Sequence, residues 1–412
     1  MSGVGWVDFS STDRARVQEV LALLKEKGTL DELGIGQVRD AFSDRLFPGF
    51  STIQTTARYF LAVPKILRDW AAMAPRQRRA KPLMRYLEEA ENKLAIDLVK
   101  NHELQKLPLD GIIGHTLIES GGAARKPSST YWNGLRVFNI VRTQASLAEF
   151  CREWRQEDHD LDAVDSEHGA DDATSRFDAD VKLPPATPLA CATPEGLTLR
   201  LSLAEAKFLS SHFQMASGQK ESVAAQLLSH QLAGEAIDMK HQRFAAFSVW
   251  AAQQEALSQR CRALIANAQR FSLAIEGAHI VFNHLVAKRL EHEVLRQRCE
   301  EEFPDWDQRA RQAGVFHDAA LPQWLDAEDS QVKWKVSCVQ FLHEWNAAHC
   351  RGASSSELEK LVEKQAKANK PGRSLLVRLP RQAADWYGMK ELDYRWPTAR
   401  RMLSDIEETN VC

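Results

Sequence analysis

The sequence predicts a mainly α-helical protein, with a multi-helix N-terminal domain and a C-terminal helical bundle that includes a few short strands. Three observations predict this fold class: apolar residues recur three and four positions apart along most of the chain, alanine is dense in the second half, and helix-start and helix-stop signals separate the segments. The chain has 412 residues, of which 44% are hydrophobic and 26% charged. These values are typical of a globular protein with two or three domains.

Charge divides the chain into four expected segments. The net charge is −3, yet ten acidic residues and one arginine lie between Gln156 and Asp180, where large apolar side chains are almost absent. Such a segment cannot bury enough apolar surface to order itself. We therefore expect a helical domain with a basic block at 1–154, an acidic flexible linker at 155–186, a helical bundle at 187–350 and a basic element at 351–412. The acidic linker is also a hypothetical competitor of nucleic acid for a basic cleft.

The stretch around Pro48-Gly49 predicts two consecutive helices with a sharp corner between them. Before the corner, an amphipathic helix is indicated by an apolar stripe that consists of Ile35, Val38, Phe42 and Leu46. After it, Ser51 and Gln54 have the spacing of a capping box, which predicts a second helix from Ser51 that Pro64 breaks or kinks. This corner suits a helix-turn-helix module that reads DNA, but similar corners occur throughout helical proteins.

Four motifs resemble those of a family of uncharacterised prokaryotic proteins. They are GW-x-DFS at residues 5–10, RDAFSDRLFPG-x-STIQT-x-ARYFL-x-VP at 39–64, PSS-x-YWNGL at 127–135 and DYRW-x-x-AR-x-x-LSDI at 393–406. The resemblance runs nearly from end to end, and the second motif is specific. It implies a domain of unknown function, with no activity or catalytic residue to carry over. It also implies a component of a bacterial multi-protein system, for which phage defence is one setting.

Most of the remaining chain also shows helical patterns. The helices expected from these patterns are residues 14–27, 86–107, 227–237, 244–268, 271–298 and a final one in DYRWPTARRMLSDI. Alanine allows helices to pack closely, so the second half predicts a bundle. Pro371-Gly372, followed by residues 374–379, predicts a turn into a short strand.

Two basic blocks are the most informative pattern for function. Residues 51–142 hold 15 Lys/Arg against 8 Asp/Glu, and residues 359–401 hold 11 against 5. Such blocks attract phosphate backbones and release counterions, which predicts salt-dependent binding of DNA or RNA. The alternative for the first block is a solvated loop between two helices, and in the second block Trp396 can cover the core instead of a ligand. The candidate nucleic-acid-binding residues are Arg58, Lys65, Arg68, Arg76, Arg78, Arg79, Lys81, Arg125, Lys126, Arg395, Arg400 and Arg401.

A glycine-rich stretch at residues 111–126 precedes two aromatic residues. It matches neither G-x-x-x-x-G-K-[ST] nor G-x-G-x-x-G, so no nucleotide cofactor is expected, and its glycines are interpreted as turns and close helix contacts. A loop with Arg125 and Lys126 can hold a phosphate while Tyr131 and Trp132 stack on a base. The favoured alternative places both aromatic rings in the core.

Cysteine and histidine spacing argues against a metal centre. The seven cysteines are scattered without a C-x-x-C pair, which indicates reduced thiols and a cytoplasmic protein. His279, His284, His343 and His349 do not form H-E-x-x-H, so no metal is expected. The amino terminus lacks a signal-peptide pattern and the apolar runs are short, so no membrane partner is expected.

These patterns lead to three hypotheses about function. The leading one is a non-enzymatic protein that binds DNA or RNA, and the alternative is a scaffold that holds other protein subunits. Salt should weaken nucleic-acid binding steeply but leave apolar scaffold contacts intact. The third hypothesis is a metal-dependent nuclease in which Glu205, Lys207 and Asp110 form the site, although Ala206 and Phe208 place the E-x-K stretch on a helix instead of a strand. No small-molecule ligand is indicated.

Overall fold

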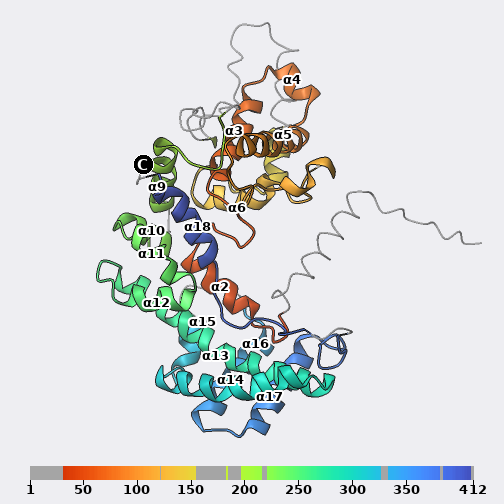
Figure 1. The fold of residues 1–412 in the computed structure, drawn as a ribbon, viewed down its shortest axis with the longest axis vertical. Coiled ribbons are helices and arrows are strands. Elements are labelled where there is room, and N and C mark those ends of the chain that lie inside the picture. The colour runs from red at the N-terminus through yellow and green to blue at the C-terminus, as the bar shows by residue number, and fades with distance from the viewer. Residues whose placement is uncertain are drawn as a thin grey trace, which may run out of the picture. The chain divides into compact units, whose positions relative to one another are not determined.

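The described part of the protein is mainly helical and contains no β-strand (Figure 1). The computed structural model describes residues 31–120, 122–154, 182–183, 196–215, 220–325, 333–380 and 384–409. The predicted helix at 14–27 and the acidic segment at 156–180 lie outside these residues. Within them, every helix is too short or too polar to cross a lipid bilayer.

The described residues belong to two compact units, each assembled from separated parts of the chain. The first unit draws on Met1–Arg45, Phe244–Gln253 and Arg262–Tyr394, and the second draws on Leu46–Arg243, Gln254–Cys261 and Arg395–Cys412. The four sequential segments expected from charge are a different division of the chain, and they stay a prediction.

The helices of the first unit include part of α2 and most of α13, because the division falls inside both. The bounds are α2 (Gly36–Leu46), α12 (Phe244–Ala252), α13 (Gln259–Leu290), α14 (Glu293–Gln312), α15 (Ala320–Leu325), α16 (Val336–Cys350) and α17 (Ser355–Asn369). Those of the second unit are α3 (Tyr59–Ala71), α4 (Pro75–Ala80), α5 (Leu83–Leu104), α6 (Pro127–Val137), α9 (Leu203–Met215), α10 (Val223–Ser229), α11 (Ala233–Ala236) and α18 (Trp396–Glu407), with the 3-10 turns η1 (His115–Ser120) and η3 (Met239–His241).

The helix before the corner is confirmed, but the predicted start of the next helix is wrong. All four residues of the apolar stripe are buried in or beside α2, and Gly49 forms the corner with a φ of +79°. The next helix, α3, begins at Tyr59 instead of Ser51. The amides of the intervening loop bond to distant side chains, since Tyr131 and Asp405 accept them, and they cannot also bond along a helix. Pro64 lies inside α3, which continues to Ala71.

Four further sequence expectations need correction. The helix predicted at 227–237 is interrupted between α10 and α11, where Gln231 has a φ of +56°, and the helix predicted at 244–268 is interrupted between Ala252, where α12 ends, and Gln259, where α13 begins. No break occurs near residue 270, because α13 continues to Leu290; the chain turns instead at Glu291, which has a φ of +53°. Residues 374–379 form turns instead of a strand. The amides of Val377 and Arg378 both donate to the carbonyl of Ser374 at 2.9 Å, a local pattern that a strand cannot make.

Each unit has an aromatic core of its own. In the second unit, four buried phenylalanine rings pack with centroids 4.3–6.4 Å apart; they are Phe50, Phe60, Phe138 and Phe213. In the first unit, the ring of Trp306 on α14 lies against Gly277 on α13, where an added Cβ would come within 2.1 Å of the ring. Its indole N–H donates to the carbonyl of Leu273 at 2.7 Å. A glycine in α13 thus allows the two helices to approach closely.

Candidate functional site

The first basic block forms a short helix, α4, that is held onto the second unit by its central arginine. Arg78 is 5% exposed; its guanidinium donates to the carbonyl of Ala71 at 2.8 Å and lies 5.7 Å from the centre of the Trp70 ring. The indole N–H of Trp70 donates to the carbonyl of Lys81 at 2.9 Å, beyond the other end of α4. Arg76 and Arg79 are exposed on the same helix. Arg78 therefore has a packing role, while its neighbours face solvent.

The cations after α4 are partly neutralised by one carboxylate. Lys81 and Arg85 pair with Glu89 at 2.5 and 3.1 Å, and together they hold the pKa of Glu89 below its ordinary value. The ammonium of Lys81 also lies 5.2 Å from the centre of the Tyr86 ring. By contrast, Arg76 forms no ion pair with any residue that the structure describes. The exposed positive charge of this block therefore includes that of Arg76 on α4.

Arg58 lies inside the second unit, although it was a candidate phosphate-binding residue. It is 4% exposed and donates to the carboxylate of Glu205 on α9 and to the carbonyl of Arg200. The second oxygen of Glu205 accepts the amide of Ser202 at 2.7 Å. The E-x-K stretch is helical, as predicted, and both oxygens of Glu205 have protein donors. Among the residues with described placement, no group of three or more His, Cys, Asp or Glu side chains is arranged to hold a metal ion.

The other candidates near α3 and α6 make contacts within the second unit. Lys65 pairs with Asp69 one turn later, with nitrogen–oxygen distances of 2.7 and 3.0 Å. Arg68 donates to the carbonyl of Leu183 at 3.2 Å. Lys126, just before α6, donates to the side chain of Asn92 at 2.5 Å, and its neighbour Arg125 is half-buried.

The three candidates at α18 also have structural contacts. Arg395 is half-buried, and Arg400 makes two hydrogen bonds, of 2.9 and 2.6 Å, to the carbonyl of Ile237. Arg401 is exposed and donates to the carbonyl of Thr55 at 3.2 Å. Trp396 is fully buried, so it covers the core instead of facing a ligand.

The aromatic residues after the glycine-rich stretch lie in the core, as the favoured alternative predicted. Tyr131 is fully buried and Trp132 is 6% exposed, so neither can stack on a base. The hydroxyl of Tyr131 accepts the amides of Thr55 and Thr56 at 2.8 and 3.0 Å, and donates to the carbonyl of Thr56 at 2.8 Å. Asp405 accepts from the Thr56 hydroxyl, and burial raises its pKa to about 6. Residues from three of the sequence motifs, at 39–64, 127–135 and 393–406, thus meet at the loop before α3.

A buried carboxylate occupies the N-terminus of α6. Glu91 on α5 is 3% exposed and accepts from the amide and the hydroxyl of Ser128. Burial raises the pKa of Glu91 to about 7 from its ordinary 4.5, and it outweighs the hydrogen bonds from Ser128, which favour the charged form. This carboxylate fills the position where an anionic ligand would bind.

This raised pKa predicts that stability depends on pH. Between about pH 4.5 and pH 7 the folded protein keeps a proton on Glu91 that the unfolded chain releases, so the free energy of unfolding falls as pH rises, by up to about 3 kcal/mol. Glu91→Gln keeps an acceptor for Ser128 but does not titrate. We expect urea unfolding at pH 5 and pH 8 to show a smaller loss for this variant than for the parent protein. Equal losses in the two proteins would contradict the assignment.

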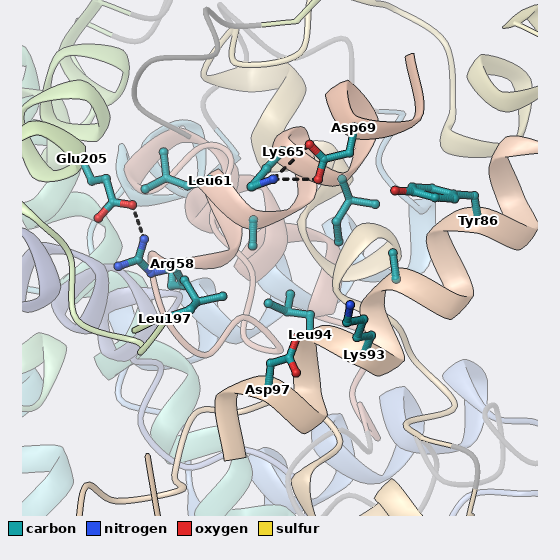
Figure 2. A pocket seen from close by; sticks show the side chains of 13 residues that line it. Arg58, Leu61, Lys65, Asp69, Tyr86, Lys93, Leu94, Asp97, Leu197 and Glu205 are labelled. Atoms are coloured by element: carbon teal, nitrogen blue, oxygen red, sulfur yellow. Dashed lines mark hydrogen bonds and ion pairs between the residues drawn. The ribbon is translucent and has the colours of Figure 1, made fainter. Parts of the chain in front are cut away.

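A groove of about 210 Å³ lies between α3 and α5 in the second unit (Figure 2). Its floor is apolar, and its rim carries both signs of charge. The residues lining it are Arg58, Leu61, Ala62, Lys65, Ile66, Asp69, Tyr86, Ala90, Lys93, Leu94, Asp97, Leu197 and Glu205. The sequence reasoning missed this groove, because Lys93 and Asp97 look like ordinary charges on the surface of a helix.

Comparison with known proteins gives a family and no activity. The model of a family described as "Family of unknown function (DUF6361)" matches residues 1–301. No curated protein and no solved structure matches the chain.

Proposed function

The chain belongs to the Family of unknown function (DUF6361), and we propose that it is a nucleic-acid-binding component of a bacterial multi-protein system that acts by binding and not by catalysis. The observation that supports this proposal is α4, on which Arg76 and Arg79 are exposed while Arg78 between them is buried. The proposed interface keeps these two exposed arginines and leaves out the buried Arg58 and Arg78.

The anchoring of α4 favours binding of a phosphate backbone. Arg78 and Trp70 hold the helix in place, so little backbone entropy is lost when Arg76 and Arg79 contact phosphates. Arginine presents several donors in a planar fork that suits phosphate oxygens. Each phosphate that is neutralised lowers the slope of log affinity against log salt by about 0.9 on duplex DNA. Two arginines therefore account for a slope of about 2.

We expect the double variant Arg76→Gln/Arg79→Gln to bind nucleic acid more weakly than the parent protein and with a salt slope smaller by about 2. Fluorescence anisotropy with labelled single-stranded DNA, duplex DNA and RNA across a salt series measures both quantities. A matched control, Arg270→Gln/Arg351→Gln, removes two exposed arginines from the first unit and should leave the slope unchanged.

Two outcomes would contradict the proposal. If the α4 variant and the control retain the same affinity and slope, α4 is not the interface. If none of the three nucleic acids binds at low salt, the leading hypothesis is wrong, and pull-down experiments should then test the interaction scaffold.

A further inference from the structure

We infer that the groove between α3 and α5 binds one unstacked guanine base of a single-stranded nucleic acid. This inference rests on the proposed nucleic-acid binding and specifies the class of ligand. Its support is the shape of the groove, its position beside the basic block, and two opposite charges on α5 that have no partner among the residues that the structure describes.

The groove begins next to the basic block. Tyr86 lines it, and the ammonium of Lys81, a residue of the block, lies 5.2 Å from the centre of the Tyr86 ring. Asp69, on the last turn of α3 before α4, lines the same end. A strand whose phosphates contact Arg76 and Arg79 therefore has a short path to the groove.

The dimensions and floor of the groove suit a single flat ring system. Its volume of about 210 Å³ is below the range of roughly 300–1,000 Å³ that is typical for drug-sized ligands. The floor is formed by Leu61 and Ile66 on α3 and by Ala90 and Leu94 on α5. An unstacked base presents two apolar faces, which such walls can cover. A paired base in a duplex cannot enter.

The rim along α5 has the polarity of one base edge. Lys93 and Asp97 are four residues apart, so they lie on the same helix face, and Figure 2 shows both at the groove. Neither makes a hydrogen bond or an ion pair with a residue that the structure describes. An ammonium only donates and a carboxylate only accepts. This rim therefore offers a donor beside an acceptor that can take two hydrogen bonds.

Guanine is the base whose edge complements this order. Its Watson–Crick edge presents the O6 acceptor followed by two adjacent donors, N1–H and the N2 amino group. O6 would accept from Lys93, while the two donors would meet the carboxylate of Asp97. Adenine, cytosine and uracil do not present two adjacent donors, so they would leave part of the carboxylate unpaired. On the opposite wall, Lys65 and Asp69 are already paired with each other.

The inner end of the groove is lined by a buried arginine. Arg58 lines the groove and is 4% exposed, and its Nε atom has no hydrogen-bond partner among the residues that the structure describes. Its other guanidinium nitrogens donate to Glu205 and to the carbonyl of Arg200. This nitrogen is itself buried, so Arg58 closes the inner end of the groove and is not one of the groups that contact the base.

The test compares single-stranded oligothymidine probes that carry one central guanine, inosine or adenine. With the full-length protein, anisotropy should show about tenfold tighter binding of the guanine probe than of the adenine probe, and inosine, which lacks the N2 amino group, should fall between them. Asp97→Asn should abolish this order, because the amide replaces one of the two acceptor oxygens with an NH2 group, which is itself a donor and cannot pair with N1–H or the N2 amino group. Asp110→Asn, at an exposed site outside the groove, should preserve it.

A second variant and a second ligand separate the possible failures. Ala90→Met places a larger side chain in the groove and should remove the guanine preference, while the dependence of duplex binding on α4 remains.

Equal affinity of the parent protein for all three probes, with binding still dependent on Arg76 and Arg79, would overturn the groove inference and leave the proposed function intact. If the parent protein binds none of the nucleic acids, both the groove inference and the proposed function are overturned. The second ligand is guanosine monophosphate. If it binds although the oligonucleotides show no guanine preference, the groove binds a free nucleotide, and the inference that it binds a base of a single-stranded nucleic acid is overturned.

Discussion

Replacing Arg58 with leucine is expected to destabilise the second unit by about 3–5 kcal/mol, because it leaves the carboxylate of Glu205 buried without its cation. The carbonyl of Arg200 loses its donor in the same variant. The loss is larger than the energy of a surface ion pair, for which about 0–1 kcal/mol is usual, since neither Arg58 nor Glu205 is more than 4% exposed.

Urea unfolding of Arg58→Leu, followed by circular dichroism, measures this loss. The double variant Arg58→Leu/Glu205→Gln removes the uncompensated charge and should recover part of the stability. Arg76→Leu is the matched surface control and should change the free energy of unfolding by about 0.5 kcal/mol or less. A loss for Arg58→Leu as small as that of the control would show that the buried pair is not needed for folding.

Gly134→Ala should cost about 3 kcal/mol or more, although it adds a single methyl group. The new Cβ on α6 would lie 2.4 Å from the carbonyl oxygen of Gly49 and 2.7 Å from a ring carbon of Phe60. The contact at Gly49 is with a backbone atom of the corner, and the Phe60 ring is fully buried. Neither the backbone nor the ring can move away from the new Cβ without repacking the core.

A second glycine provides the control for this experiment. Gly234 lies in α11, and the nearest atom to an added Cβ there is 3.8 Å away, on the side chain of Glu407. Gly234→Ala should be neutral or stabilising by about 0.5–1 kcal/mol, because alanine loses less backbone entropy in a helix. Thermal unfolding of both variants under the same conditions makes the comparison. Equal midpoints would show that α6 can shift away from the corner.

Periodicity predicted the parts of the fold that depend on near neighbours in the sequence. The apolar stripe of α2, the existence of α5 and the burial of Tyr131 follow from side-chain spacing, which decides the buried face of a helix. The start of α3 could not be predicted in this way. Tyr131 and Asp405 compete for the amides of the loop before it, and both lie far away in the sequence. Local signals such as the Ser51–Gln54 pair cannot outweigh such contacts.

Amino-acid composition predicted the basic block of the candidate site but could not predict which of its arginines are exposed and which are buried. Arg76 and Arg78 are two residues apart and chemically identical, yet one is exposed and the other packs on Trp70. Helix α4 determines which arginine faces inward, and this short helix was not predicted. The groove also depends on tertiary structure, because Lys93 and Asp97 on α5 line a groove only when α3 packs opposite them.

The bond between Asp405 and the loop before α3 has a consequence for synthesis of the chain. The Thr56 hydroxyl and the Ala57 amide find their acceptor 349 and 348 positions later. At roughly 5–20 residues per second, a ribosome needs at least tens of seconds to make the intervening chain. During that time the corner and α3 exist without α18, and their exposed apolar surface is available to chaperones. The second unit therefore completes its folding late in translation, although most of it is encoded early.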